Sequence, residues 1–216
     1  MNLWLPARQL YPQYSWRRGR TGAGGATATW NSADKNARIT LSGGDLIATK
    51  SNGSSFAMLR ATVGASTGKK FCSFVFDTAN GQTFGLSLGG SSLADGVWAG
   101  SSTSSIGYYP AANGVFFSSS PFQTVSLGAN TGHTYDLAVD LTNRLLWGRR
   151  NGGNWNNSGT ADPATGVGGV DYSAVTQLAG LTLYPTGSMD SSGSGLTANF
   201  GASAYTYAAP SGFGNW

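Results

Sequence analysis

Tyr135-Asp136-Leu137-Ala138-Val139-Asp140-Leu141, followed after Thr142 by Asn143-Arg144-Leu145-Leu146-Trp147, is the stretch that decides the fold of this chain. In its first half, large apolar residues alternate with aspartate or alanine, which is the two-residue period of a β-strand. Such alternation is typical of an antiparallel sheet with one buried and one solvated face. The two halves therefore predict a β-hairpin, and we expect Asp136 and Asp140 to lie on its solvated face.

Short apolar segments separated by turn residues continue this pattern on both sides of the hairpin. Ser42-Gly43-Gly44-Asp45 and Ala112-Asn113-Gly114 have the composition of hairpin turns, and Asn80-Gly81 favours the positive φ angles of another tight hairpin. Residues 89–105 form a Gly/Ser-rich loop, and residues 148–177 form a longer polar one, whose length is usual for a functional site or an interface. We predict further strands at residues 37–41, 46–49, 56–63, 69–77, 82–88, 106–109, 115–118, 181–188 and 196–201.

The composition also favours an all-β fold. The 216 residues include 33 glycines, 10% charged residues and 40% hydrophobic residues, and every acidic residue is an aspartate. Glutamate favours helices whereas aspartate favours turns and strand ends, so the absence of glutamate fits a chain that is nearly free of helix. The length suits a single all-β domain, which we place at residues 26–216.

Residues 1–25 differ from the rest of the chain. Their four arginines account for the whole net charge of +4, because the other nine basic residues are balanced by nine aspartates. Large apolar groups mixed with arginine are typical of protein-interface anchors, and Gly19 to Gly25 form a glycine-rich hinge. We therefore predict an N-terminal docking arm at residues 1–25, with simple disorder as the alternative. Its predicted partner-docking residues are Leu3, Trp4, Leu5, Leu10, Tyr11, Tyr14, Trp16, Arg17, Arg18 and Arg20.

Several kinds of site are not expected. The only cysteine, Cys72, lies in an apolar run where a buried thiol is expected, and it precludes an intrachain disulfide. Without a Cys/His cluster we expect no metal and no cofactor. No stretch approaches the roughly 18 apolar residues of a membrane span, and Pro6 ends the first apolar run too early for a signal peptide. The three clustered arginines of the arm are too small a footprint to predict a nucleic-acid partner.

The two ends of this predicted domain carry motifs of a known family. Leu183-Tyr184-Pro185, Leu196-Thr197-Ala198-Asn199-Phe200-Gly201 and Pro210-Ser211-Gly212-Phe213 together resemble the closing pattern of a SPRY domain. Upstream, Trp30-Asn31-Ser32-Ala33-Asp34-Lys35 and Leu59-Arg60-Ala61-Thr62 resemble the first segments of SPRY-like modules in tailed-phage virion proteins. The resemblance spans about residues 28–214. It implies an antiparallel two-sheet β-sandwich of the SPRY-like jelly-roll type, preceded here by an extended N-terminal arm.

One segment departs from that family. In place of a short turn after the hairpin, this chain has a long loop insertion at residues 148–177, which begins Arg149-Arg150-Asn151-Gly152. SPRY domains bind ligands with their loops, so this departure prevents the usual binding site of the family from being transferred to this chain.

The residues that could support catalysis do not form a recognised set. Asp136 and Asp140 lie about 13 Å apart along the predicted strand, which exceeds the carboxyl separation that either glycosidase mechanism uses. His133 is the only histidine and has no nucleophile-elbow motif beside it. Asp190-Ser191-Ser192-Gly193-Ser194 lacks the acid density of a calcium loop. We therefore predict no catalytic residues, no metal ligands and no enzymatic activity.

Trp155 is the best candidate for a ligand contact, since an aromatic ring edged by amides suits a sugar ring. The same composition suits burial against a neighbouring subunit, where tryptophan is enriched, and we favour this second interpretation. Trp98, in its Gly/Ser-rich loop, is a further candidate. The predicted ligand-binding residues are Trp98, Arg149, Arg150, Asn154, Trp155 and Asn156.

Two functions fit these observations. We expect a non-enzymatic structural protein of a phage virion, of decoration, collar or fibre type, that is assembled in the host cytoplasm. Its arm would hold it on other virion proteins, as a homo-oligomer and without a membrane partner. The alternative is a receptor- or glycan-binding module of a tail fibre, which would recognise a host-surface glycan with the loops around Trp155 and Trp98.

Overall fold

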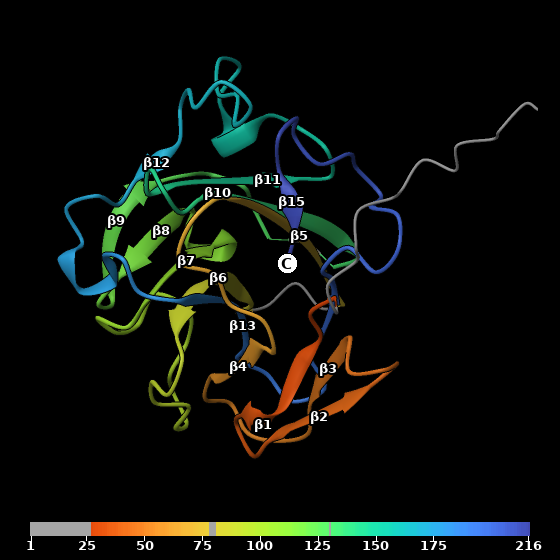
Figure 1. Ribbon diagram of the computed structural model, residues 1–216. Helices are drawn as coiled ribbons and strands as arrows, with labels where there is room; N and C mark the ends of the chain where they lie inside the picture. Colours follow the sequence, from red (N-terminus) through yellow and green to blue (C-terminus); the bar gives the residue numbers. More distant parts are fainter. Residues whose placement is uncertain (1–26, 78–80, 130) are drawn as a thin grey trace, which may run out of the picture.

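The computed structural model describes residues 27–77, 81–129 and 131–216, and these residues form two stacked antiparallel β-sheets (Figure 1). The predicted docking arm at residues 1–25, with all its docking residues, lies outside the described residues. Sheet 1 has the strand order β1 (Trp30–Lys35), β4 (Ala57–Ala61), β13 (Leu183–Met189), β6 (Thr83–Leu88), β7 (Ser105–Tyr109), β8 (Gly114–Phe117) and β9 (Ser120–Thr124).

Sheet 2 packs against sheet 1. Its order is β12 (Val170–Asp171), β11 (Leu145–Arg150), β10 (His133–Asp140), β5 (Lys69–Phe76), β14 (Gly195–Asn199), β3 (Ile47–Lys50) and β2 (Ile39–Ser42), and the short β15 (Gly214–Asn215) runs parallel to β5. The helical elements of the described chain are three single 3₁₀ turns, η1 (Pro110–Ala112), η2 (Trp155–Asn157) and η3 (Thr176–Leu178). The predicted all-β, two-sheet architecture is therefore confirmed.

The core between the sheets is built mainly from aromatic and aliphatic side chains. Trp30 of β1 packs against Phe200, with ring centroids 5.1 Å apart and planes nearly perpendicular. Phe76 of β5 in sheet 2 lies 6.0 Å from Phe84 of β6 in sheet 1, again centroid to centroid. All four rings are completely buried. Such contacts combine a large buried area with a preferred ring geometry, which fixes how the two sheets face each other.

The hairpin predicted from residues 135–147 is confirmed. β10 and β11 pair from Tyr135 opposite Arg150 to Asp140 opposite Leu145. The expectation that its aspartates are solvated is wrong, because Asp136 and Asp140 are only 0% and 2% exposed. The alternation in the sequence marks the two faces correctly, but the outer face of sheet 2 is covered as well.

A second, smaller apolar cluster provides that cover. Phe71, Ala138, Trp147 and Trp155 are buried on the outer face of sheet 2, and residues from the end of the chain pack on them. Tyr205 approaches Phe71 to a centroid distance of 4.6 Å, and Phe213 approaches Trp147 to 6.3 Å. The C-terminal segment therefore acts as a third layer over sheet 2.

The predicted turns have different outcomes. The hairpins β2–β3 and β7–β8 form as expected. The tight hairpin expected at Asn80-Gly81 does not form, because β5 and β6 on either side of it belong to different sheets. Residues 78–80 lie outside the described residues, while Gly81 does have a positive φ of 58°. Gly81 therefore lies where the chain passes from β5 in sheet 2 to β6 in sheet 1.

Residues 89–104 cross the outer face of sheet 1. The backbone N–H of Ala99 donates to Thr83 Oγ1 at 3.2 Å, and that of Gly100 donates to Ser105 Oγ at 3.0 Å. The loop lies close to the sheet at Gly107, where a Cβ atom would come within 2.8 Å of Ala99 Cβ. Glycine is needed there to allow the approach. This loop forms one wall of the cleft on sheet 1 that is described below.

Candidate functional site

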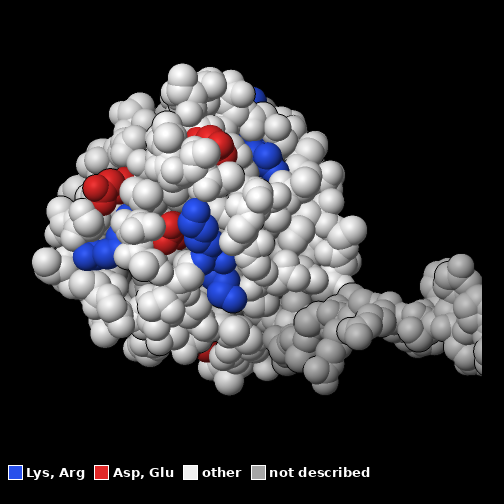
Figure 2. Space-filling model, turned by 45° about the horizontal axis from the view of Figure 1, so that its top comes forward, with Lys and Arg blue, Asp and Glu red and all other residues white. Residues whose placement is uncertain are grey.

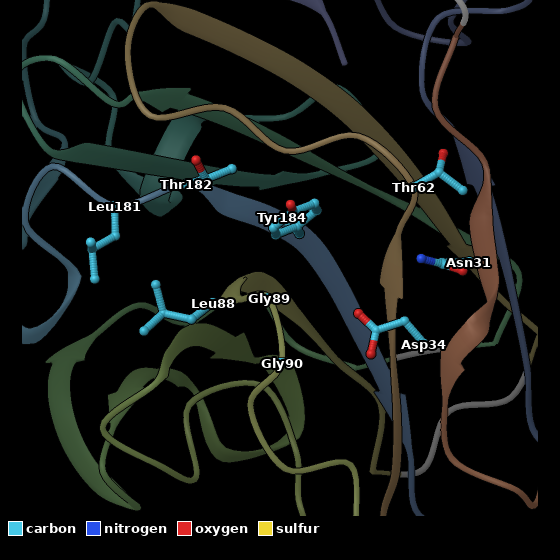
Figure 3. A pocket seen from close by; sticks show the side chains of 9 residues that line it. All are labelled: Asn31, Asp34, Thr62, Leu88, Gly89, Gly90, Leu181, Thr182 and Tyr184. Atoms are coloured by element: carbon cyan, nitrogen blue, oxygen red, sulfur yellow. The ribbon is translucent and has the colours of Figure 1, made fainter.

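A cleft of about 610 Å³ opens on the outer side of sheet 1 (Figure 3). Its walls come from β1, from the end of β4, from the end of β6 with the start of the crossing loop, and from the start of β13. Tyr184 lies in the middle of the view, with the two leucines on one side and Asp34, Asn31 and Thr62 on the other. The lining residues are Asn31, Asp34, Thr62, Leu88, Gly89, Gly90, Leu181, Thr182 and Tyr184.

Asp34 is held in place by a buried arginine. Arg60 of β4 donates from Nε to Asp34 Oδ2 at 2.7 Å and from Nη2 to Oδ1 at 2.6 Å. The arginine side chain is 1% exposed, whereas that of Asp34 is 28% exposed. Paired, bidentate hydrogen bonds of this kind are short and fix orientation as well as charge. The Asp34 carboxylate therefore faces the cleft in a fixed orientation, and the buried Arg60 guanidinium neutralises its charge.

The same arginine also fixes the crossing loop. Its Nη1 donates to Ser91 Oγ at 2.6 Å, and its Nη2 donates to the carbonyl oxygen of Ser91 at 2.9 Å. Ser91 directly follows Gly89 and Gly90, which line the cleft. Arg60 thus ties β1, β4 and the crossing loop together beneath the cleft.

Tyr184 is half-buried in a slot between two glycines. A Cβ atom on Gly64 would lie 2.8 Å from Tyr184 Cε1, and one on Gly89 would lie 3.0 Å from Cε2. Both distances are shorter than ordinary carbon contacts of about 3.5–4.0 Å. Any larger residue at either position would therefore displace the ring, and the two glycines let it lie in the cleft.

Sequence reasoning missed this site. In the sequence, Asn31, Asp34 and Arg60 stand out only as parts of segments that resemble SPRY-like modules. The one available signal was Arg60 itself, a single cation in a strand whose other residues are apolar and whose five positions are all buried. The cleft as a whole had no signal, because four separate stretches of chain form its walls.

The structure places Trp155 and Arg149, two of the predicted ligand residues, in a buried cluster on the other sheet. Trp155 is 9% exposed, and the Arg149 guanidinium lies 4.2 Å from the centroid of its ring. Arg149 Nε donates to Asp136 Oδ2 at 2.6 Å. Burial raises the pKa of Asp136 to about 6, although the hydrogen bond and the charge of Arg149 oppose that rise. These contacts engage Asp136, Arg149 and most of the Trp155 ring in packing.

Asn156, a third predicted ligand residue, is also engaged. Its Oδ1 accepts from the Tyr108 hydroxyl at 2.8 Å and from the backbone N–H of Gly148 at 2.9 Å. Its Nδ2 donates to the carbonyl oxygens of Leu146 and Gly168 at 3.1 and 2.9 Å. The side-chain amide therefore ties the insertion to β11.

Arg150 and Asn154 lie together at a separate position. They line a small pocket of about 140 Å³ with Ser126, Leu127, Gly153 and Asn157. Asn154 is exposed and Arg150 is half-buried. Of the predicted residues in the insertion, these two are the ones that the structure leaves facing a pocket.

Trp98 belongs to a cluster of four half-buried aromatic rings with Phe56, Tyr109 and Phe116. The Trp98 ring lies 5.7 Å from Phe56, 5.4 Å from Tyr109 and 5.4 Å from Phe116, measured between centroids. Phe56 precedes Ala57, which pairs with Met189, whereas Tyr184 is at the opposite end of β13. The Trp98 cluster and the cleft therefore lie toward opposite ends of sheet 1.

Charged side chains are few on the surface and of both signs. On the face drawn in Figure 2, Lys and Arg side chains lie close to Asp side chains, without a wide area of one sign. Within the described ranges, no three His, Cys, Asp or Glu side chains lie together as a metal site would require. No helix in the same part of the chain has the length and apolarity needed to cross a membrane.

The described residues define a class of protein, the two-sheet antiparallel β-sandwich with loops folded over its outer faces. Within that class the fold is SPRY-like. The SPRY domain of human HERC1 superposes with a TM-score of 0.59 at 15% identity, covering 81% of this chain and 99% of that domain. The PSpry domain of TRIM65 gives a TM-score of 0.54 at 12% identity, covering 80% of this chain and 89% of the other.

A third structure, a human SPRY domain, gives a TM-score of 0.51 at 14% identity and covers 77% of this chain and 98% of that one. At such identities the likeness concerns the fold. No protein-family model and no curated protein sequence matches this chain. The predicted SPRY-like sandwich is therefore confirmed, and the relation to phage virion proteins stays a prediction.

Proposed function

We propose that this chain is a non-enzymatic structural protein of a phage virion, which docks on another virion protein through residues 1–20 and presents its SPRY-like body outward. The observation that carries the proposal is the separation of charge and anchors along the chain. All of the net charge of +4 lies in the first twenty residues, together with a dense set of Trp, Tyr and Leu, while the body is neutral. Anchors of this composition dominate the energetics of protein interfaces.

Deletion of residues 2–20 tests this docking function. The truncated protein is expected to remain folded and soluble but to be absent from assembled particles, as measured by mass spectrometry of purified virions. A second variant with Trp4, Trp16 and Tyr14 replaced by alanine separates the aromatic contribution from the charge, which it leaves intact. Normal incorporation of the deletion variant would show that attachment does not use the arm.

The proposal that the protein is not an enzyme is supported by the state of the two aspartates of β10. Asp136 is paired with Arg149, and Asp140 accepts hydrogen bonds from the backbone N–H and side-chain amide of Asn143 at 2.9 and 2.8 Å. Both groups are engaged in holding the hairpin and its turn. Hydrolytic turnover that is abolished by Asp136→Asn or Asp140→Asn, in variants that keep the wild-type unfolding temperature, would overturn this part of the proposal.

A second candidate function is recognition of a host-surface receptor or glycan by the loops around Trp98 and Trp155. One observation favours the Trp98 side of this idea, because four half-buried aromatic rings gather there. A host-cell binding assay with Trp98→Ala and with Arg150→Ala, which alters the small pocket beside Trp155, tests it. Unchanged binding of both variants would remove these loops from consideration.

A further inference from the structure

We propose that the cleft on sheet 1 is a binding site for a neutral saccharide. This inference gives the recognition function proposed above a different location and a ligand class, and it does not depend on docking through the arm. It rests on three features of the cleft: the pattern of hydrogen-bonding groups, the balance of charge, and the half-buried aromatic ring beside apolar walls.

The polar groups around the cleft offer both donors and acceptors. Each oxygen of Asp34 accepts one hydrogen bond from Arg60, and a carboxylate oxygen can accept more than one. The Oδ1 of Asn31 accepts from the backbone N–H of Ala33 at 2.9 Å, which directs the amide and leaves Nδ2 as a donor. The hydroxyls of Thr182 and Tyr184 add groups that donate and accept, and that of Thr62, which accepts from the backbone N–H of Thr29 at 3.0 Å, adds a donor. This mixture matches sugar hydroxyls, which also do both.

The balance of charge favours a neutral ligand. Among the residues that the structure describes, Asp34 is the only charged one that lines the cleft, and the Arg60 guanidinium within 2.6 Å neutralises it. The cation is buried behind the carboxylate and so cannot reach an anion directly. An anionic ligand would meet the carboxylate first, and an ammonium group would be opposed by the guanidinium. A sugar hydroxyl carries no charge, so hydrogen bonds to the groups of the cleft are sufficient to bind it.

Tyr184 supplies a surface for the apolar face of a sugar ring. The glycines at its edges, Gly64 and Gly89, have no side chains that could cover it. Leu88 and the 47% exposed Leu181 provide apolar contacts on one side of the ring. An aromatic plate with polar groups along one side suits a ring whose C–H bonds and hydroxyls point in different directions. The volume of about 610 Å³ is within the usual range of about 300–1,000 Å³ for small-molecule sites.

The site is also held in its binding geometry by the fold. Arg60 anchors Asp34 on one side and the backbone of Ser91 on the other, so the carboxylate and the wall at Gly89 and Gly90 keep a fixed separation. A site that is ordered before binding loses less conformational entropy when the ligand arrives. Holding Asp34 and Ser91 in place is therefore the role that we assign to the buried cation of Arg60 beneath this otherwise neutral cleft.

Saturation-transfer NMR on the full chain with lactose, maltose, cellobiose and chitobiose tests the proposal. At least one of these neutral disaccharides is expected to receive saturation on its ring protons, with a Kd that weakens at least tenfold in Tyr184→Ala. Tyr184→Phe, which keeps the ring, should bind within about threefold of wild type. Trp98→Ala, which alters the other aromatic cluster, should leave this binding unchanged.

The variant Asn31→Ala serves as a second probe, because it removes the Nδ2 donor of this half-buried side chain, together with the local bond from Ala33 N–H to Oδ1, and keeps Asp34 and Arg60 paired. It should also weaken binding at least threefold while the unfolding temperature stays at the wild-type value. No transfer to any of the four disaccharides, or transfer that Tyr184→Ala retains, overturns the proposal. Preferential binding of sialyllactose or of a lysine-containing peptide at this cleft overturns the neutral ligand class. Because the assay uses protein in solution, its result is separate from incorporation into particles.

Discussion

Arg60 and Asp34 are an ion pair with unequal burial, and this inequality determines what each residue contributes to stability. The arginine is 1% exposed, whereas the aspartate is 28% exposed and can be hydrated when its partner is lost. Removing one partner of a buried pair is costly mainly because the other charge is left uncompensated. The two single substitutions are therefore not equivalent.

We predict that Asp34→Ala destabilises the protein by about 3 kcal/mol, because it leaves a buried guanidinium without its counter-charge. Arg60→Met leaves a partly hydrated carboxylate in place of a buried charge, so its cost is expected to come mainly from the lost hydrogen bonds to Ser91. Urea unfolding measures both values. Arg38→Ala is the matched control, because the Arg38–Asp95 pair is 31% and 46% exposed and such pairs contribute about 0–1 kcal/mol. Equal losses for Asp34→Ala and Arg38→Ala would contradict this account.

Asp136 gives a prediction about pH. Its folded-state pKa of about 6 lies above its ordinary value of 3.8, with burial as the main cause, and its Oδ1 has no hydrogen-bond partner among the described residues. The folded state therefore binds the proton more tightly than the unfolded state between about pH 4 and pH 6. The stabilisation from this group is complete below pH 4 and is lost as the pH rises to 6.

In unfolding experiments between pH 7 and pH 4, Asp136→Asn is expected to remove this contribution, on the order of 1–3 kcal/mol. Asp171→Asn is a control of opposite sign, because hydrogen bonds from the backbone and side chain of Ser173 lower the pKa of that exposed aspartate. Its contribution is present at neutral pH and is lost on acidification. A wild-type pH profile that Asp136→Asn leaves unchanged would show that this carboxyl does not titrate in that range.

At the scale of elements, the loop 89–104 depends on the small residues beneath it. It lies close to the sheet at Gly107 of β7, where a Cβ atom would lie 2.5 Å from the carbonyl oxygen of Ala99 and 2.8 Å from its Cβ. The backbone of the loop is held there through Thr83 and Ser105. One added methyl group at this point has no free space, so it must move either the loop or the strand.

We predict that Gly107→Ala destabilises the protein by about 1–3 kcal/mol, as overpacking of a close contact does. It should also displace the crossing loop and change the fluorescence of Trp98, which lies next to Ala99 in that loop. Gly159→Ala is the matched control, because a Cβ there would meet no atom within 4 Å, and it should alter neither property. Thermal unfolding followed by tryptophan fluorescence distinguishes the two variants.

Individual strands could be predicted from the sequence, but their partners could not always be. The alternation in residues 135–141 identified β10, and the turns at 42–45 and 112–114 identified two hairpins that form. The Asn80-Gly81 signal was misassigned, since a turn dipeptide does not specify which sheet receives the next strand. The aspartates of β10 were misassigned because alternation does not reveal that Tyr205 and Phe213 cover the second face. The cleft escaped prediction for a related reason, as its walls meet only in the folded chain.

On the scale of the whole molecule, the structure describes how the C-terminal segment joins the body. The C-terminal segment is part of the fold: Phe213 and Tyr205 pack on the outer cluster of sheet 2, and Trp216 is 4% exposed. The carbonyl oxygen of Trp216 accepts from the backbone N–H of Ala28 at 3.2 Å, which joins the two ends of the described body. Residues 1–20, by contrast, carry the net charge and are proposed to act outside the body.

Two truncations should therefore have opposite effects. Deletion of residues 202–216 removes Tyr205 and Phe213 and exposes Phe71, Trp147 and Trp155. It also removes Ala208, whose carbonyl oxygen accepts from Arg149 Nη2 at 2.8 Å. Because apolar burial contributes about 25 cal/mol per Å², uncovering these large rings is expected to lower the unfolding temperature by more than 10 °C or to prevent soluble expression.

Deletion of residues 2–20 should shift the unfolding temperature by less than about 2 °C. The core, the crossing loop over sheet 1 and the C-terminal segment over sheet 2 all stay intact in this variant. Differential scanning calorimetry compares the two, and a C-terminal truncation as stable as the full chain would show that the third layer is not needed for the fold.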